Sequence, residues 1–201
     1  MASSEKTLKL EVATLEDVSA ITDLWFAAFT DPGPRYLWPD TSGVHQWLED
    51  AHRSDLQNKH FQRYIKIVDP QSADSQGRPR IVAFAKWDTS NLDDRGRRYP
   101  PWHEDMPGAA CEAFFQRADD ERRRVMGDRK HYYLDTLGTH PDYQRQGLGS
   151  MLVKWGCELA DQDGVGVYVD ASTAGASLYR KFGFVDESLP DAGDFASMAR
   201  R

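Results

Sequence analysis

The sequence predicts a single α/β domain, and three observations support this fold class. The chain has 201 residues, 40% of them hydrophobic, which is enough for one well-buried core and short for two domains. From residue 131 onward, strand-like and helix-like patterns alternate, with a glycine-rich loop after the first strand. Two further apolar segments, 61–68 and 80–87, are joined by a polar loop and indicate a β-hairpin.

The N-terminal part predicts one strand followed by two helices. Residues 8–12 form the strand, and Thr14 with Asp17 then gives a T-x-x-D helix start. The first helix ends at 31–34, where two prolines and a glycine oppose a helical backbone. A second helix fits 42–56. The residues that we expect to face the core from these helices are Val18, Ile21, Leu24, Trp25, Ala28, Val44, Trp47, Leu48 and Ala51.

Residues 88–130 have the least regular pattern of the chain. They contain ten acidic and nine basic residues, so this nearly neutral segment does not read as a nucleic-acid-binding arm. The stretch from about 109 to 126 has helical character, with Gly127 as its stop. We interpret the segment as an insertion packed beside the active cleft, which explains its aromatic residues better than a free linker would.

The C-terminal part predicts, in order, a strand at 131–139, a helix from about 146, a buried strand at 165–170, a helix ended by Gly183 and a short strand near 195–198. The first of these helices is amphipathic, with helically spaced apolar residues at Leu148, Leu152, Trp155 and Leu159. Ser172 or Thr173 is the expected cap of the second helix.

The loop at 144–150, with the sequence Gln-Arg-Gln-Gly-Leu-Gly-Ser, is the most informative motif. It stands between an apolar strand and an amphipathic helix. A helix start leaves backbone N–H groups unpaired and carries the positive end of the helix dipole, so it attracts phosphate. Gly147 and Gly149 remove side chains that would keep a bulky diphosphate from this backbone. The motif therefore predicts a diphosphate-binding loop.

Composition disfavours several classes of function. The net charge of −7 and the pI near 5.3 disfavour binding to nucleic acid or to an anionic membrane, and leave room for a cationic substrate. Cys111 and Cys157 give neither a disulfide framework nor a zinc-ligand spacing, so we expect no metal. No apolar run of 18 residues and no apolar signal core occur, which predicts a cytoplasmic protein.

Three segments occur in order in the C-terminal part: Leu-Gly-Thr-His-Pro at 137–141, the Q-x-x-G-x-G motif at 144–149, and Leu-Tyr-Arg-Lys-Phe-Gly-Phe at 178–184. Together they resemble the acyl-CoA-binding half of the GNAT superfamily of N-acetyltransferases. The resemblance implies a mixed, twisted sheet, splayed at its centre and flanked by helices.

The resemblance also implies different roles for the two halves of the chain. Residues 1–201 would form one N-acetyltransferase domain, with an acceptor-side half at 6–130 and an acyl-CoA-binding half at 131–201. It implies acetyl-CoA as the cofactor, with the pantetheine arm between two parallel strands. The residues implied to bind the cofactor are Leu137, Gly138, Thr139, Gln144, Arg145, Gln146, Gly147, Leu148, Gly149, Ser150, Ser172 and Tyr179. Ser172 stands where asparagine is common in the superfamily.

Two residues are candidates for catalysis. The resemblance places Tyr179 where a hydroxyl commonly protonates the leaving sulfur; the alternative is an aromatic packed on a helix face. Asp135 is the candidate base, because alternate residues of a strand point the same way, which would put 135 on the face of Leu137 and Thr139. The alternatives are a structural carboxylate or a water relay.

For the acceptor we expect a small-molecule primary amine that attacks the thioester directly in a ternary complex, in a monomer or homodimer. Tyr36, Trp38, Trp102 and Tyr133 could line its site. Alternatively, the aromatic residues of the proline-rich loops pin those loops to the core.

Other functions fit parts of the pattern. A non-catalytic acyl-CoA-binding module would keep the glycine loop without turnover, and an acetyltransferase for protein N-termini or lysines would share the cofactor half. In a dinucleotide-binding oxidoreductase, Asp170 would bind the ribose, but Leu152 occupies the third glycine position of that motif. We set the oxidoreductase aside.

Overall fold

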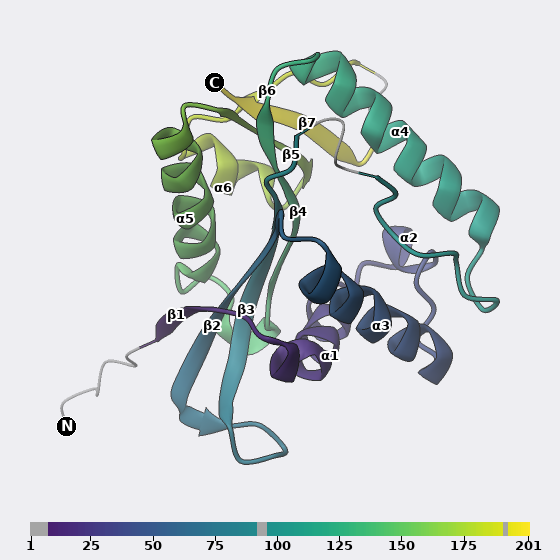
Figure 1. The fold of residues 1–201 in the computed structure, drawn as a ribbon, viewed down its shortest axis with the longest axis vertical. Coiled ribbons are helices and arrows are strands. Elements are labelled where there is room, and N and C mark those ends of the chain that lie inside the picture. Colours follow the sequence, from purple (N-terminus) through teal and green to yellow (C-terminus); the bar gives the residue numbers. More distant parts are fainter. Residues whose placement is uncertain (1–7, 92–95, 191–192) are drawn as a thin grey trace.

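The sheet of the protein has seven strands. The computed structural model describes residues 8–91, 96–190 and 193–201. The strands lie in the order β1-β2-β3-β4-β5-β7-β6, and their bounds are β1 Lys9–Val12, β2 Gln62–Ala73, β3 Pro79–Asp88, β4 His131–Thr139, β5 Gly166–Ser172, β6 Val185–Asp186 and β7 Phe195–Arg200 (Figure 1). All neighbours are antiparallel except β4 and β5. The sheet is therefore mixed, as predicted.

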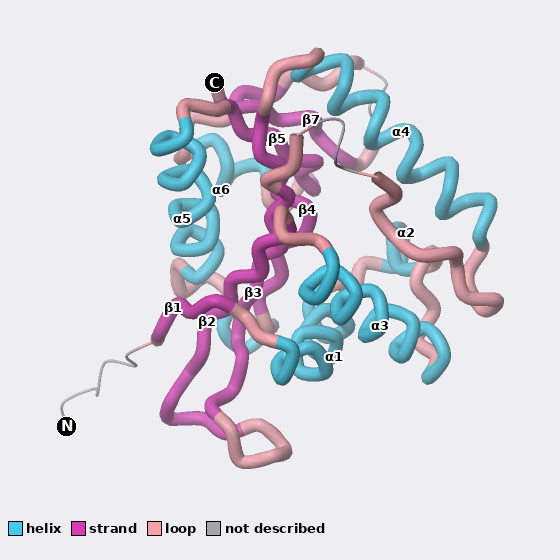
Figure 2. The backbone as a smooth tube through the Cα atoms, viewed as in Figure 1, coloured by secondary structure: helices cyan, strands magenta, loops and turns pink. Residues whose placement is uncertain are grey.

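Helices cover both faces of this sheet (Figure 2). Their bounds are α1 Val18–Ala28, α2 Pro32–Arg35, α3 Ser42–Asn58, α4 Gly108–Met126, α5 Leu148–Asp163 and α6 Ala176–Arg180. Helices α5 and α6 pack on one face around a core that includes Trp87, Leu134 and Leu152. Helices α1, α3 and α4 pack on the other face, where the core is rich in tryptophan and phenylalanine.

Several elements differ from the sequence prediction, among them β2, which extends to Ala73, and β6, which was not predicted. Helix α1 ends at Ala28, before the predicted stop at 31–34. The prolines of that stop lie in the one-turn helix α2, because Asp31 caps it by accepting from the Gly33 N–H at 3.0 Å and Pro32 fits its first position. Helix α6 is shorter than expected, since Ser172 still belongs to β5. Strand β7 extends to Arg200 and pairs with both β5 and β6.

The sheet opens between its two parallel strands. Register pairs between β4 and β5 run from His131 with Gly166 to Leu134 with Val169, and none is formed beyond that point by the described residues. There β4 continues alongside β3 only, while β5 continues alongside β7 only. The central splay implied by the family resemblance is thus present, and it leaves backbone groups of β4 free on the side of the gap.

A β-bulge lies at the apex of this opening. Lys86 of β3 pairs with Thr136, but Trp87 pairs with Leu134, so Asp135 has no partner on β3. An extra residue in one strand reverses the alternation of side chains beyond it. The two ends of β4 therefore place odd-numbered residues on opposite faces.

Gly156 of α5 is fixed by close packing on the other side of the core. A Cβ atom at this position would lie 2.1 Å from Cζ2 of Trp87, which is fully buried. We expect Gly156→Ala to lower the free energy of unfolding by about 1–3 kcal/mol, although alanine favours a helix. Urea denaturation measures this loss. In a Trp87→Phe background the same substitution should cost less, and an equal cost in both backgrounds would contradict the assigned clash.

Candidate active site

The glycine loop has the geometry of an anion cradle. Arg145 and Gly147 have left-handed backbone, with φ of 62° and 87°, and Gly147 caps α5 without any side-chain hydrogen bond. In the described chain, no backbone N–H from 145 to 150 donates a hydrogen bond to another protein group. A Cβ at Gly147 would meet nothing within 4 Å, so the space in front of these donors is open. The loop can therefore accept a diphosphate.

The cradle continues into the open edge of β4. The Leu137 side chain packs with the core on the α5 face, 3.7 Å from where a Cβ of Gly149 would lie. In the described chain, the backbone edge from 136 to 138 faces the gap between β4 and β5 without a strand partner, while the carbonyl oxygens of Asp135 and Thr139 accept hydrogen bonds from the side chains of Arg98 and Gln144. An extended amide-bearing chain could pair there as another strand does. Leu137 of β4 and Gly149 of the loop, two of the predicted cofactor residues, therefore lie next to each other.

Asp135 does not share the face of Leu137, so that expectation was wrong. The bulge at Asp135 reverses the side-chain alternation, and its carboxylate points toward α3 and the segment before α4. Tyr133 lies on the same face as Asp135, as expected, because both contact Arg98.

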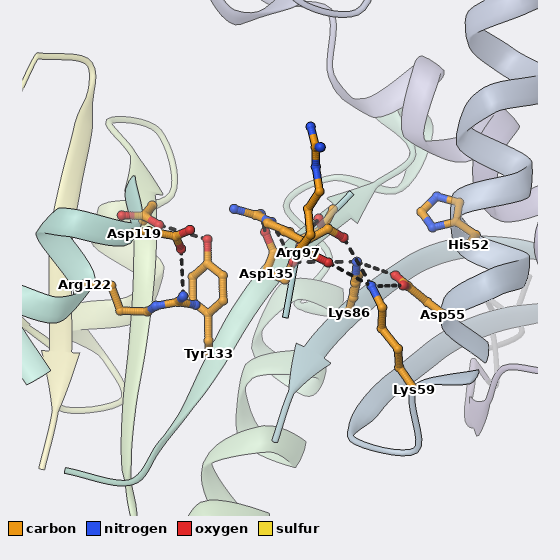
Figure 3. Close-up of polar contacts among 12 residues, drawn as sticks. His52, Asp55, Lys59, Lys86, Arg97, Asp119, Arg122, Tyr133 and Asp135 are labelled. Carbon is orange, nitrogen blue, oxygen red and sulfur yellow. Dashed lines mark hydrogen bonds and ion pairs between the residues drawn. The ribbon is translucent and has the colours of Figure 1, made fainter. Parts of the chain in front are cut away.

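Asp135 is held in a buried ion network (Figure 3). Arg98 contacts both carboxylate oxygens at 2.8 and 2.9 Å, and Lys86 Nζ lies 3.6 Å away. The side chains of Asp135 and Lys86 are each 1% exposed. Burial alone would raise the pKa of Asp135, but the Arg98 and Lys86 charges outweigh it and hold that pKa well below its ordinary value. Such a carboxylate is a poor proton acceptor.

The network continues away from the gap. Lys86 forms an ion pair with Asp55 at 2.6 Å, and Tyr64 donates a hydrogen bond to the same carboxylate at 3.0 Å. His52 Nδ1 lies 3.0 Å from the Tyr64 oxygen. Burial and the Lys86 charge lower the pKa of His52 to about 3, so its ring is neutral. Because the Tyr64 hydroxyl donates its own proton to Asp55, it accepts the hydrogen bond from His52. These contacts anchor α3 to β2 and β3.

Tyr179 lies on the opposite face of the sheet. It belongs to α6, is 7% exposed and packs against Phe184 with ring centroids 5.7 Å apart. Its hydroxyl makes no hydrogen bond to any described residue. Burial raises the pKa of Tyr179, so the hydroxyl keeps its proton at neutral pH. It is a free donor beside the end of β5. Ser172, at that end, accepts from the Gly175 N–H at 3.2 Å.

The aromatic residues of the loops that were predicted to line the acceptor site are divided between the core and a pocket. Trp38 packs against Trp25 and Phe115, and Trp102 stacks on Phe115 with an interplanar angle of 12°. Both therefore pin their loops to the core. Tyr36 alone of the three lines a pocket, and it is 59% exposed.

This pocket has a volume of about 230 Å³, and Asp170 is one of its lining residues. The sequence pattern suggested this carboxylate only as a ribose-binding residue of an oxidoreductase. Asp170 of β5 accepts hydrogen bonds from Tyr133 at 2.9 Å and Tyr168 at 2.7 Å. The insertion supplies much of the wall through α4. Other residues that line the pocket include Tyr36, Phe114, Arg117, Glu121, Asp194 and Phe195. An acidic residue within a buried strand was the available signal.

Other features of the described chain lie apart from this site. A larger pocket of about 510 Å³ lies between α3, β2 and α5 and contains none of the predicted site residues. Among the described residues, no group of histidine, cysteine or acidic side chains could hold a metal ion. Over the same residues, no helix combines the length and apolarity that a membrane crossing requires.

Comparisons with known proteins agree with this geometry. An acetyltransferase of Stachybotrys chartarum is 34% identical over an alignment of 213 positions, which covers 96% of this chain and 88% of that protein. A Corynebacterium glutamicum structure, described as histone acetyltransferase HPA2 and related acetyltransferase, has the same fold, with a TM-score of 0.58 and 22% identity over 96% of this chain and 95% of that chain. So does the PaiA N-acetyltransferase of Thermoplasma acidophilum, solved with coenzyme A, with a TM-score of 0.57 and 11% identity over 97% and 99%. Residues 21–184 match the model of the acetyltransferase (GNAT) family, and the chain therefore belongs to that family.

Proposed function

We propose that the protein transfers the acetyl group of acetyl-CoA to the primary amine of a small molecule. The observation that carries the proposal is the row of free N–H groups from 145 to 150 beside the open edge of β4. The loop would bind the diphosphate, and 136–138 the amide groups of the pantetheine arm. When bound there, acetyl-CoA supplies a thioester carbonyl at the gap in the sheet. The relative solved with coenzyme A supports this choice of donor.

The two predicted catalytic residues receive different roles. Tyr179 would donate its proton to the departing sulfur, because its hydroxyl is neutral and free on the face of α5 and α6. Asp135 would act through Arg98 and Lys86 as a positioning residue that fixes the bulge, since its paired carboxylate is poorly suited to accept a proton. The base must then be another group.

The size and charge of the pocket favour a small acceptor. A volume of about 230 Å³ suits a compact amine better than a folded protein surface, although a single peptide terminus would also fit. The wall carries three carboxylates, Asp170, Glu121 and Asp194, and the cation Arg117, while Arg124 pairs with Glu121 at 2.8 Å from outside the lining. This balance favours a substrate that arrives as an ammonium ion.

A glutamate in place of Gly147 tests the cradle. The new carboxylate would stand among the phosphate-binding amides, so acetyl-CoA at about 100 times its Kd should no longer add its roughly 2.7 kcal/mol of stability. Gly164→Glu is the matched control: it also has positive φ, 66°, and open space at its Cβ, but lies at the other end of α5. Thermal melting with and without acetyl-CoA measures both. A Gly147→Glu variant that keeps the wild-type rise in Tm would refute the cradle.

Turnover distinguishes an enzyme from a binding module. We expect release of free thiol from acetyl-CoA that depends on an added amine, from a panel of phenethylamine, hexylamine, spermidine, glucosamine and phenylalanine. A rise in Tm with acetyl-CoA but no amine-dependent thiol release would favour the non-catalytic module. Preference for a peptide with a free amino terminus over all these amines would instead favour a protein acetyltransferase.

A further inference from the structure

Asp170 and Asp135 occupy equivalent places on the two sides of the gap. Leu134 and Val169 form the last register pair of β4 and β5, so each aspartate is the first residue after the strands separate. Both carboxylates lie on the face of α3 and α4, whereas Tyr179 lies on the face of α5 and α6. The sheet thus separates a hydroxyl donor from two carboxylates, with the gap between them.

The surroundings of the two carboxylates differ. Asp135 touches two cations and is 1% exposed at its side chain. Asp170 receives hydrogen bonds only from the neutral hydroxyls of Tyr133 and Tyr168, and it lines the pocket. A carboxylate has about four lone-pair sites, so two tyrosines leave acceptor capacity for a ligand. Burial raises the pKa of Asp170 by more than the two hydrogen bonds and the charges of Arg98 and Arg122 lower it.

We propose that Asp170 is the base of the transfer reaction: it binds the acceptor ammonium in the pocket and takes its proton. This inference rests on the proposed function. The amine nitrogen then forms a bond to the thioester carbon as the carbon–sulfur bond breaks. The nitrogen loses two protons in all, both of which leave through Asp170 to solvent in turn. Tyr179 gives one proton to the sulfur and regains one from solvent, so that one proton is released for each amide and thiol formed.

The pocket also defines the class of amine. Tyr36, Phe114 and Phe195 offer aromatic surface next to the carboxylate, and Phe114 meets Phe195 edge to face at 5.6 Å. Asp194 adds negative charge on the same wall, where the charge of Glu121 is compensated by Arg124. An aryl or alkyl primary amine without an acidic group satisfies both properties. A carboxylate next to the amine would oppose the pocket charge.

Asp170→Asn removes the proton acceptor with little change of shape. We expect kcat with the best amine of the panel to fall on the order of 100-fold or more, while the rise in Tm with acetyl-CoA is kept. Asp120→Asn is the control: Asp120 also lies on α4, but its side chain is 58% exposed and does not line the pocket. It should keep kcat within twofold. Phenethylamine should exceed phenylalanine in kcat/KM by at least tenfold.

The pH profile separates a base from a merely structural residue. The charged and titratable groups that face Asp170 are Tyr133, Tyr168, Arg98, Arg122, Glu121, Arg117 and Asp194. The tyrosines have raised pKa values and that of Glu121 is lowered, so Asp170 should produce the acidic limb of kcat at saturating amine. This limb should be absent from the residual activity of Asp170→Asn.

The outcomes are distinguishable. Wild-type turnover that survives in Asp170→Asn with an unchanged acidic limb would overturn the role of Asp170 and leave the proposed function standing. A variant that loses activity together with the acetyl-CoA-induced rise in Tm would also overturn it, in favour of a structural role. Absence of amine-dependent turnover in the wild type would refute the proposed function itself. Faster turnover of phenylalanine than of phenethylamine would refute the assigned class of amine.

Discussion

Replacing Asp135 with asparagine is expected to lower the free energy of unfolding by about 3–5 kcal/mol at neutral pH, because it leaves buried charge without its partner. Arg98 and Lys86 would keep their charges, and only Asp55 would remain to balance Lys86. A loss of this size corresponds to a fall in Tm on the order of 10 °C for a chain of this length. The loss should appear in protein free of any ligand, since the network lies within the fold itself.

The same loss should depend on pH in a defined direction. The fold holds the pKa of Asp135 well below its ordinary value of 3.8, and unfolding returns it to that value. A group whose pKa is depressed in the folded state adds stability above its unfolded pKa, and that stability disappears as the pH falls below it. The difference between wild type and Asp135→Asn should therefore be full at neutral pH and shrink progressively below about pH 4.

Denaturant unfolding at several pH values measures both effects. Asp161→Asn is the matched control, because Asp161 makes a similar bidentate contact with Arg200 but its side chain is 55% exposed. Because solvent screens this exposed pair, the control should cost far less stability than Asp135→Asn. If Asp135→Asn costs no more than this control, the ion network does not stabilise the fold, and the role of Asp135 as a positioning residue has no support.

Local patterns predicted the elements that surround the site. Strand β4 has the bounds 131–139 that its apolar run indicated, and the glycine loop leads into α5 as expected. These features depend on residues close together in the chain: alternation, helical spacing and the backbone preference of glycine. The same holds for α4, whose start at Gly108 lies within one residue of the prediction.

The bulge and the ion network could not be predicted in this way. Nothing in Leu134-Asp135-Thr136 marks an extra residue, because the bulge is defined by the register of β3 against β4. Lys86, Asp55 and Arg98 likewise meet Asp135 only through the packing of distant segments. A candidate base chosen from the alternation of a single strand was therefore placed on the wrong face.

Asp170 shows what signal was available. The part of β5 before it is apolar or aromatic, with Val167, Tyr168 and Val169 buried. A charged residue in such a run contradicts the local pattern, and such contradictions are expected at functional sites. Sequence alone could mark the residue, but only the pocket and the two tyrosine hydroxyls indicate a role for it.

Replacing Tyr179 with phenylalanine is expected to lower kcat on the order of 100-fold while the affinity for acetyl-CoA changes less than about twofold. The ring would keep its packing against Phe184, so only the hydroxyl is lost. The hydroxyl has no protein partner among the described residues, which means that its removal breaks no internal hydrogen bond. A fall in kcat without a fall in Tm would thus report chemistry and not folding.

The control for this variant is Tyr132→Phe, which removes a hydroxyl that donates to Asp163 on the same face but away from the gap. It should affect stability and leave kcat unchanged, the reverse of Tyr179→Phe. The two profiles separate the proton donor from a packed aromatic residue, because packing is preserved in both variants. If Tyr179→Phe turns over as fast as the wild type, the sulfur receives its proton from water, and the position of Tyr179 beside β5 serves the core of α6 alone.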